Sequence, residues 1–201
     1  MKMSRMTLLA SMAIAALSVP AVLADENSAN KRPSPVGVAL LEDAQFPRPD
    51  VDVMGMRLCF IYGRNADVQG LDIGIFGCGV EGNLFGLQLS GVFNDVGSSW
   101  GAVQFAGIVN VCAEDFYGCQ LSGIANSTGQ SLYGGQLSIF NQAQTLYGAQ
   151  VGLFNKSESA CGLQIGLVNI AERARGLMQI GVVNVIKSNK NQVFPIINMG
   201  F

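Results

Sequence analysis

The stretch from Gly148 to Asn184 contains one short phrase written three times. It reads G-A-Q-V-G-L-F-N at 148–155, G-L-Q-I-G-L-V-N at 162–169 and, with one residue inserted, G-L-M-Q-I-G-V-V-N at 176–184. Looser copies extend back to about Met56. A chain built on one repeated glycine, glutamine and asparagine is typical of an architecture that stacks equal units. The pattern therefore indicates a fold more directly than a reaction.

Alignment on the closing asparagine gives tandem repeats that follow one another at intervals of 14 to 17 residues. Two degenerate early copies carry Gly63 and Gly77 in the asparagine slot, so the chain holds about ten units. This period is shorter than that of helical or leucine-rich repeats and fits one turn of a small all-β solenoid. The slot is held by Asn94, Asn110, Asn126, Asn141, Asn155, Asn169, Asn184 and Asn198.

The alternation of residues within a unit predicts a strand with one buried face. In the copy at 162–169, Leu163, Ile165 and Leu167 alternate with glutamine, glycine and valine, and Asn169 is in phase with the aliphatic residues. We therefore expect the aliphatic residues and the asparagine to point inward. A buried amide needs partners, and the asparagines one coil above and below, about 4.8 Å away, would supply them. The interpretation is a structural asparagine ladder.

The glutamines fall on the opposite side of each strand, which this interpretation places outward. Their regularity is not required by core packing, so we expect a flat interaction face beside a column of small residues two positions further on. The small residues are Ser90, Ala106, Ser122, Ser138, Gly152, Gly166 and Gly181. The glutamines are Gln88, Gln104, Gln120, Gln136, Gln150, Gln164 and Gln179.

The residue before the opening glycine is aromatic in five consecutive copies. Stacked rings contribute stability beyond the area they bury, so these residues indicate a packing column along parallel coils. They are Phe85, Trp100, Tyr117, Tyr133 and Tyr147.

Two folds fit the repeats. The glutamine and asparagine lie six residues apart in the first three full copies and five apart in the next four. Such insertions in consecutive copies can stack on one another in a parallel solenoid, which favours a single-domain β-solenoid of about ten rungs, each of 14–17 residues. The alternative is a ten-stranded antiparallel outer-membrane β-barrel, acting as a pore or anchor, because the strand number is even and the chain ends on Phe201.

The first residues have the features of a secretory signal peptide. Lys2 and Arg5 precede an apolar run at 6–19, and small residues at the minus-three and minus-one positions of the segment 21–24 predict cleavage after Ala24. We expect a signal peptide at 1–24, a proline-rich leader or N-terminal cap at 25–52 and the tandem-repeat β domain at 53–201. The prolines near Phe46 and the stretch 187–201 are candidates for capping the solenoid. The predicted location is the periplasm, the outer membrane or the cell surface.

The composition argues against several kinds of chemistry. The chain has no histidine, which removes Ser-His-Asp machinery and the commonest zinc sites. Its net charge is −2, and 65–155 contains no lysine or arginine, so nucleic acid is not an expected partner. The five cysteines show no metal spacing, and their pairing stays open, with Cys112 and Cys119 the one pair close in sequence. We expect no catalytic residue, metal or cofactor.

The entry M-G-M-R-L-C-F-I-Y-G-R-N at 54–65, the repeats and the closing F-P-I-I-N-M-G-F at 194–201 occur in order. In this combination the chain resembles the poorly characterised bacterial surface-repeat proteins over 53–201. The resemblance implies export to the cell envelope or surface and brings no catalytic residues. The expectation is a non-catalytic exported repeat protein that serves as a scaffold or interaction surface. Its partner would be an unknown protein or envelope component, with self-association and outer-membrane association left open.

Overall fold

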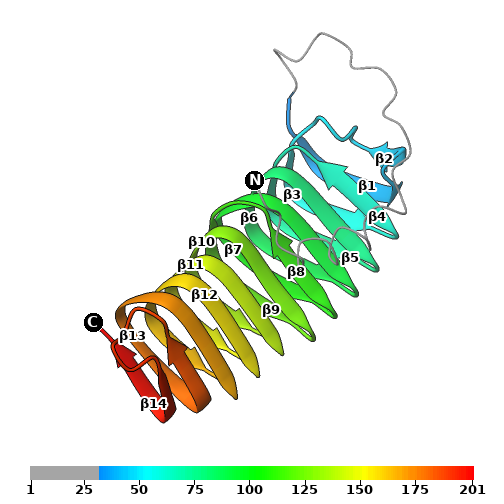
Figure 1. Ribbon diagram of the computed structural model, residues 1–201. Coiled ribbons are helices and arrows are strands. Elements are labelled where there is room, and N and C mark those ends of the chain that lie inside the picture. Colours follow the sequence, from blue (N-terminus) through cyan, green and yellow to red (C-terminus); the bar gives the residue numbers. More distant parts are fainter. Residues whose placement is uncertain (1–31) are drawn as a thin grey trace. The chain divides into compact units, whose positions relative to one another are not determined.

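The computed structural model describes residues 32–201, which form a stack of parallel β-coils (Figure 1). The stack has about ten turns, and the described residues contain no helix. The predicted signal peptide at 1–24 lies outside the described residues.

The strands follow one another along the whole described chain. They are β1 (Ser34–Leu41), β2 (Ala44–Phe46), β3 (Val53–Cys59), β4 (Tyr62–Asn65), β5 (Val68–Gly74), β6 (Gly77–Ser90), β7 (Phe93–Ala106), β8 (Val109–Cys112), β9 (Phe116–Ser122), β10 (Ala125–Leu137), β11 (Phe140–Val151), β12 (Phe154–Ile165), β13 (Val168–Ile186) and β14 (Val193–Gly200).

Each coil consists of a first strand that carries the glutamine, a short bend, and a second strand that carries the asparagine. In one coil, β9 is followed by a bend at 123–124 and by the start of β10. Neighbouring coils are parallel and in register, so Gln120 lies between Gln104 and Gln136. Stacking of like on like confirms the predicted β-solenoid. The antiparallel barrel alternative is wrong, because successive repeats pair in parallel.

The glycine that opens each repeat is required by the close approach of the coils. Gly148 has a φ of 140°, which side chains rarely tolerate, and a Cβ there would collide with the carbonyl oxygen of Gly134 in the preceding coil. The same contact recurs at Gly118, Gly134 and Gly162. A glycine column therefore follows from the stacking distance itself.

The apolar core lies at the side of the coil remote from the bend. Leu84, Phe116, Leu132 and Leu146 fill it from the first strands and are fully buried. The residues expected to be the core are instead half-buried or exposed: Ile165 is 37% exposed and Leu167 is 49% exposed. That prediction was wrong because the bend at 166–167 resets the alternation. Residues on the two strands of a coil therefore cannot be counted in one phase.

The two ends of the stack are closed by antiparallel strands. At the N-terminal end β2 pairs antiparallel with β1, which itself pairs in parallel with β3, so the first coil begins within the segment 25–52. At the C-terminal end β14 pairs antiparallel with β13. Both segments predicted as caps thus lie at the ends of the sheet. Between residues 32 and 201 no helix is long and apolar enough to cross a membrane.

Candidate functional site

The glutamines form a hydrogen-bonded ladder inside the solenoid. Each donates from its Nε2 atom to the Oε1 atom of the glutamine one coil earlier, over distances of 2.7–2.9 Å from Gln104 to Gln179. All seven glutamines are at most 2% exposed. The predicted outward interaction face at Gln88, Gln104, Gln120, Gln136, Gln150, Gln164 and Gln179 is therefore wrong. A buried amide is stable here because the next coil completes its hydrogen bonds.

The glutamine ladder ends on a buried ion pair. Gln88 donates to the Oδ2 atom of Asp72 at 2.9 Å, and Arg57 donates to both oxygens of that carboxylate at 2.8 and 2.6 Å. An ionised carboxylate can only accept, so Gln88 must present its NH₂ group to Asp72. Gln88 then offers its oxygen to Gln104, and the direction of every later hydrogen bond follows. Burial lowers the pKa of Arg57, but the hydrogen bond and charge of Asp72 outweigh it and hold that pKa above its ordinary value.

The asparagines form a second ladder with the opposite direction. From Asn94 to Asn169, each donates from Nδ2 to the Oδ1 atom of the asparagine in the next coil, at 2.8–3.1 Å. The other Nδ2 proton binds a backbone carbonyl of the next coil, as between Asn155 and Ile165 at 2.8 Å. The predicted asparagine ladder is confirmed for Asn94, Asn110, Asn126, Asn141, Asn155, Asn169 and Asn184.

The ends of the asparagine ladder differ from the prediction. Asn198 lies on the antiparallel β14 opposite Gln179 and donates to the backbone oxygen of Asn184, so it is a cap and not a ladder member. At the other end Cys78, and not Gly77, is in register with Asn94. Among the described residues, Asn94 Oδ1 and Gln179 Oε1 are buried without a hydrogen-bond partner. Each is the terminal oxygen of its ladder, where no further amide follows.

The small-residue column is explained by the asparagine ladder. A Cβ at Gly152 would lie 2.6 Å from Asn141 Nδ2, and a Cβ at Gly166 would lie 2.7 Å from Asn155 Nδ2. Ser138 Oγ donates to Asn141 Oδ1 at 2.8 Å, whereas Ser122 Oγ is buried without a hydrogen-bond partner. These residues are small because they pack against the amides of the ladder.

Four of the five predicted aromatic residues stack along the coils. The ring centroids of Trp100 and Tyr117 lie 5.9 Å apart, those of Tyr117 and Tyr133 lie 4.4 Å apart, and those of Tyr133 and Tyr147 lie 4.9 Å apart. The rings are nearly parallel, with interplanar angles of 2° to 8°. The column faces outward, since Trp100 is 70% exposed. It therefore lines the outer surface of the first strands.

The outer surface beside the aromatic column is apolar and uncharged. Between the coil of Leu87 and that of Leu167, ten aliphatic side chains and one phenylalanine lie next to the glutamine or at the bend and are each more than a third exposed. We call these residues the apolar face: Leu87, Val103, Phe105, Ile108, Ile124, Leu137, Ile139, Val151, Leu153, Ile165 and Leu167. The positions before the glutamine, after the glutamine and at the bend each form a column of residues in register. In these coils none of the three columns contains a charged residue. In these coils the outward charges lie on the second strands and at the turns after them, as at Asp95, Glu114 and Lys156, and Arg175 is an exposed charge on the first strand of the following coil.

Shallow grooves run along the apolar face at the bend. One of about 570 Å³ is lined by Leu153, Ile165, Leu167, Ile180 and Ile196 together with glycines of the small column. A second, of about 340 Å³, lies between Phe105, Leu121 and Leu137. In both grooves aliphatic walls stand over a floor of small residues, and the wall of the second groove also includes Phe105. Their lining offers an extended apolar chain many contacts and few polar groups.

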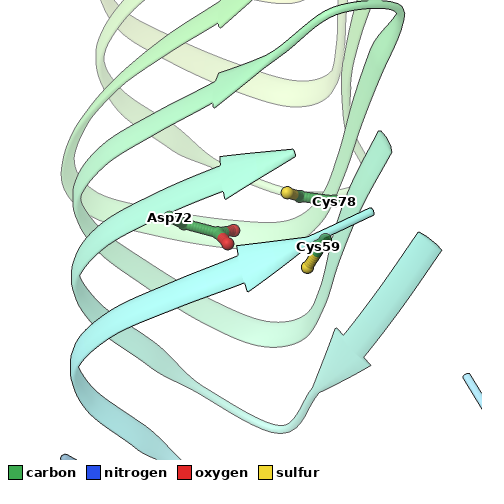
Figure 2. Close-up of side chains that lie close together, drawn as sticks. All are labelled: Cys59, Asp72 and Cys78. Atoms are coloured by element: carbon green, nitrogen blue, oxygen red, sulfur yellow. The ribbon is translucent and has the colours of Figure 1, made fainter. Parts of the chain in front are cut away.

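A cluster of titratable side chains lies at the N-terminal end of the ladders (Figure 2). The donor atoms of Cys59, Asp72 and Cys78 all lie within 4.8 Å of one another, and all three residues are buried. Thiolates and carboxylates are ligand types for zinc. However, Arg57 already binds both oxygens of Asp72, and its guanidinium charge opposes a cation at this place. Of the three side chains, the two thiols are therefore the groups that remain available to react.

The sequence did not reveal this cluster, because Cys59 and Cys78 are separated by one coil plus a bend. A signal was present in the early copies, where both glycine and cysteine replace the usual small residue and asparagine. No protein-family model matches the chain, and comparisons with curated proteins and with solved structures find no match. Fold and site therefore define the chain as a parallel β-solenoid with two internal amide ladders and an uncharged apolar face.

Proposed function

We propose that this chain is a non-catalytic, exported protein of the bacterial cell envelope that lays its apolar face on a lipid surface. The observation that carries the proposal is the uninterrupted run of exposed, uncharged side chains over successive coils. A monomer in water rarely exposes a contiguous apolar patch larger than a few hundred Å². We therefore expect another molecule to cover this face, and the solenoid would serve as its rigid support.

The chemistry of the face favours lipid as the cover. Trp100, Tyr133 and Tyr147 lie beside the aliphatic columns on the same strands, and such amphipathic rings are enriched where proteins meet the headgroup region of a bilayer. The grooves at the bend suit parts of acyl chains. From the coil of Leu87 to that of Leu167 the charged groups lie on the second strands and the turns after them, so contact through the apolar face would leave them in water. The signal-peptide pattern and the resemblance to surface-repeat proteins support export.

The test is flotation of the purified protein with phosphatidylcholine and with mixed phosphatidylcholine and phosphatidylglycerol vesicles. The wild-type protein is expected to float with both, because the face carries no charge. Leu137→Glu combined with Leu153→Glu should reduce flotation at least tenfold, since each charge would enter the acyl boundary. The matched control is Gln130→Glu, which adds a charge at an exposed position away from the face.

Two outcomes would overturn the proposal. One is a wild-type protein that stays with the soluble fraction at every vesicle concentration. The other is a protein that does not float and whose light-scattering mass doubles, with the doubling abolished by the double glutamate variant. That result would assign the apolar face to a second copy of the chain.

A further inference from the structure

Cys59 and Cys78 lie in consecutive coils with their sulfur atoms close together. Cys59 ends β3 and Cys78 lies near the start of β6, and both side chains are fully buried. Their Sγ atoms are within 4.8 Å of each other, beside the carboxylate of Asp72 (Figure 2). The other cysteines do not offer such a pair: Cys112 is buried, whereas Cys119 is exposed on the outward side of its strand. The pair that is close in sequence therefore faces opposite sides.

The surrounding residues make room for this pair of sulfurs. In register, Cys59 lies beside Gly74, and Cys78 lies beside Gly63. A Cβ at Gly63 would lie 3.0 Å from Cys59 Sγ, and a Cβ at Gly74 would lie 2.6 Å from Cys78 Sγ. Each cysteine thus faces a glycine across the bend of its own coil and a glycine in the neighbouring coil. The two sulfurs occupy the space that both glycines leave open.

We propose that Cys59 and Cys78 are a modification site, joined by a disulfide bond that links the coil of β3 to the coil of β5. The structure holds all five cysteines as free thiols, and the bond rests on the export stated in the proposed function, because disulfides form in oxidising compartments. The bond stands where the asparagine ladder has not yet begun, since Asn94 is its first member. At this place the disulfide would link neighbouring coils, as the hydrogen bonds between asparagines do in the later coils.

The reaction is a thiol–disulfide exchange with a small-molecule or protein disulfide as the oxidant. The thiolate of Cys59 attacks the oxidant and forms a mixed disulfide, releasing one reduced thiol. Cys78 then loses its proton and attacks the Cys59 sulfur, which forms the Cys59–Cys78 bond and releases the second thiol. Two protons and two electrons leave the protein. Since both sulfurs are buried in the folded chain, the step takes place before the coil closes.

In the folded chain the electrostatic surroundings of the two thiols differ. The hydrogen bond from the Cys78 thiol lowers the pKa of Cys59 against the opposing effect of burial, and the charge of Arg57 acts in the same direction as the hydrogen bond. The pKa of Cys78 is raised, first by the same hydrogen bond and then by burial. Once the coil has closed, Cys59 is thus the thiol of the pair that ionises more readily, and the thiolate is the reactive species in exchange.

The experiment refolds the full chain in a buffer of oxidised and reduced glutathione, then denatures it and alkylates it with N-ethylmaleimide. We expect Cys112, Cys119 and Cys161 to be labelled directly, and Cys59 and Cys78 only after reduction. A non-reducing digest should contain one peptide pair joined through Cys59 and Cys78. Cys161→Ser is the matched control and should leave this linked pair unchanged. Neither readout depends on lipid binding.

The thermal midpoint gives a second readout. Reductant is expected to lower the Tm of the wild-type protein by several degrees, to that of Cys59→Ser/Cys78→Ser, and to leave the variant unchanged. Direct labelling of both Cys59 and Cys78 after oxidative refolding would overturn the proposal. So would a disulfide between either residue and a different cysteine, or one equivalent of zinc bound to the reduced pair with no linked peptide.

Discussion

Arg57 and Asp72 form a buried ion pair in which the guanidinium donates from Nε and Nη2 to the two carboxylate oxygens, at 2.8 and 2.6 Å. Both side chains are at most 1% exposed. In register, Arg57, Asp72 and Gln88 occupy one column of three successive coils. The pair is thus the charged beginning of a ladder that continues in neutral amides.

Arg57→Gln should destabilise the protein by about 3–5 kcal/mol, because it leaves the Asp72 carboxylate buried without its counter-charge. The double variant Arg57→Gln/Asp72→Gln extends the neutral glutamine ladder by two coils and should recover most of that loss. Urea unfolding of the two variants and the wild type provides the comparison. A double variant no more stable than the single one would mean that the column does not behave as a continuous ladder.

Gln120→Glu tests the direction of the ladder. Gln120 donates to Gln104 Oε1 and accepts from Gln136 Nε2. An ionised glutamate would place two oxygens against each other, so we expect a loss of about 3 kcal/mol at pH 7. The protonated acid can donate to Gln104, which raises the folded-state pKa of the new glutamate. The penalty should therefore be small below the unfolded pKa of about 4.3 and grow as the pH rises above it.

Gln130→Glu is the control for this pH series, because Gln130 is exposed. Its free energy of unfolding should stay within about 0.5 kcal/mol of the wild-type value at both pH 4 and pH 7. Equal pH profiles for the two glutamate variants would contradict a buried, directional ladder.

Gly148→Ala should cost at least about 2 kcal/mol, because the position combines a φ of 140° with a backbone oxygen in the path of a Cβ. Gly135→Ala is the matched control, because Gly135 directly follows the opening glycine of the neighbouring coil. Its Cβ would meet nothing closer than 3.8 Å, and the residue in register with it is Ala149. Chemical unfolding should separate the two variants clearly; similar losses would argue against contact between the coils at the opening glycine.

Thiol reactivity should follow burial. Burial raises the pKa of Cys112 to about 12, whereas Cys119 is exposed. Iodoacetamide at pH 8 is therefore expected to modify Cys119 in the folded protein and to leave Cys112 unmodified until unfolding. Because the thiolate of Cys112 is disfavoured in the fold, stability should be unaffected below the unfolded thiol pKa of about 8.5. It should fall as the pH rises from there toward 12. Rapid modification of folded Cys112 would contradict its place in the core.

The sequence was sufficient to predict the stacked parallel coils. It was not sufficient to predict which side chains point into them. The period and the recurring asparagine predicted parallel coils and an asparagine ladder, because equal spacing brings equal residues into register. The inward turn of Gln164 was not predictable from alternation, since the bend at 166–167 changes the phase between Gln164 and Asn169. An interior lined by amides also contradicts the usual expectation that aliphatic residues fill a core. It is stable only because each coil completes the hydrogen bonds of the next.

The inward position of the glutamines also explains the apolar face. Once the glutamines point inward, Leu137, Ile165 and the residues at the bend must face outward, and a pattern that predicted a core describes a surface instead. The Cys59–Cys78 pair was hidden for a different reason. Its members belong to two coils that lack the regular phrase, so only the three-dimensional register brings them together.

The most direct test of the lipid-docking account uses the single tryptophan of the chain, Trp100, which is 70% exposed beside the apolar face. Its emission should shift to shorter wavelength when vesicles are added, and lipids brominated on the acyl chain should quench it. Leu137→Glu/Leu153→Glu should abolish both effects, and Gln130→Glu should retain them. A protein that floats with vesicles while the emission and quenching of Trp100 stay unchanged would contradict docking through this face.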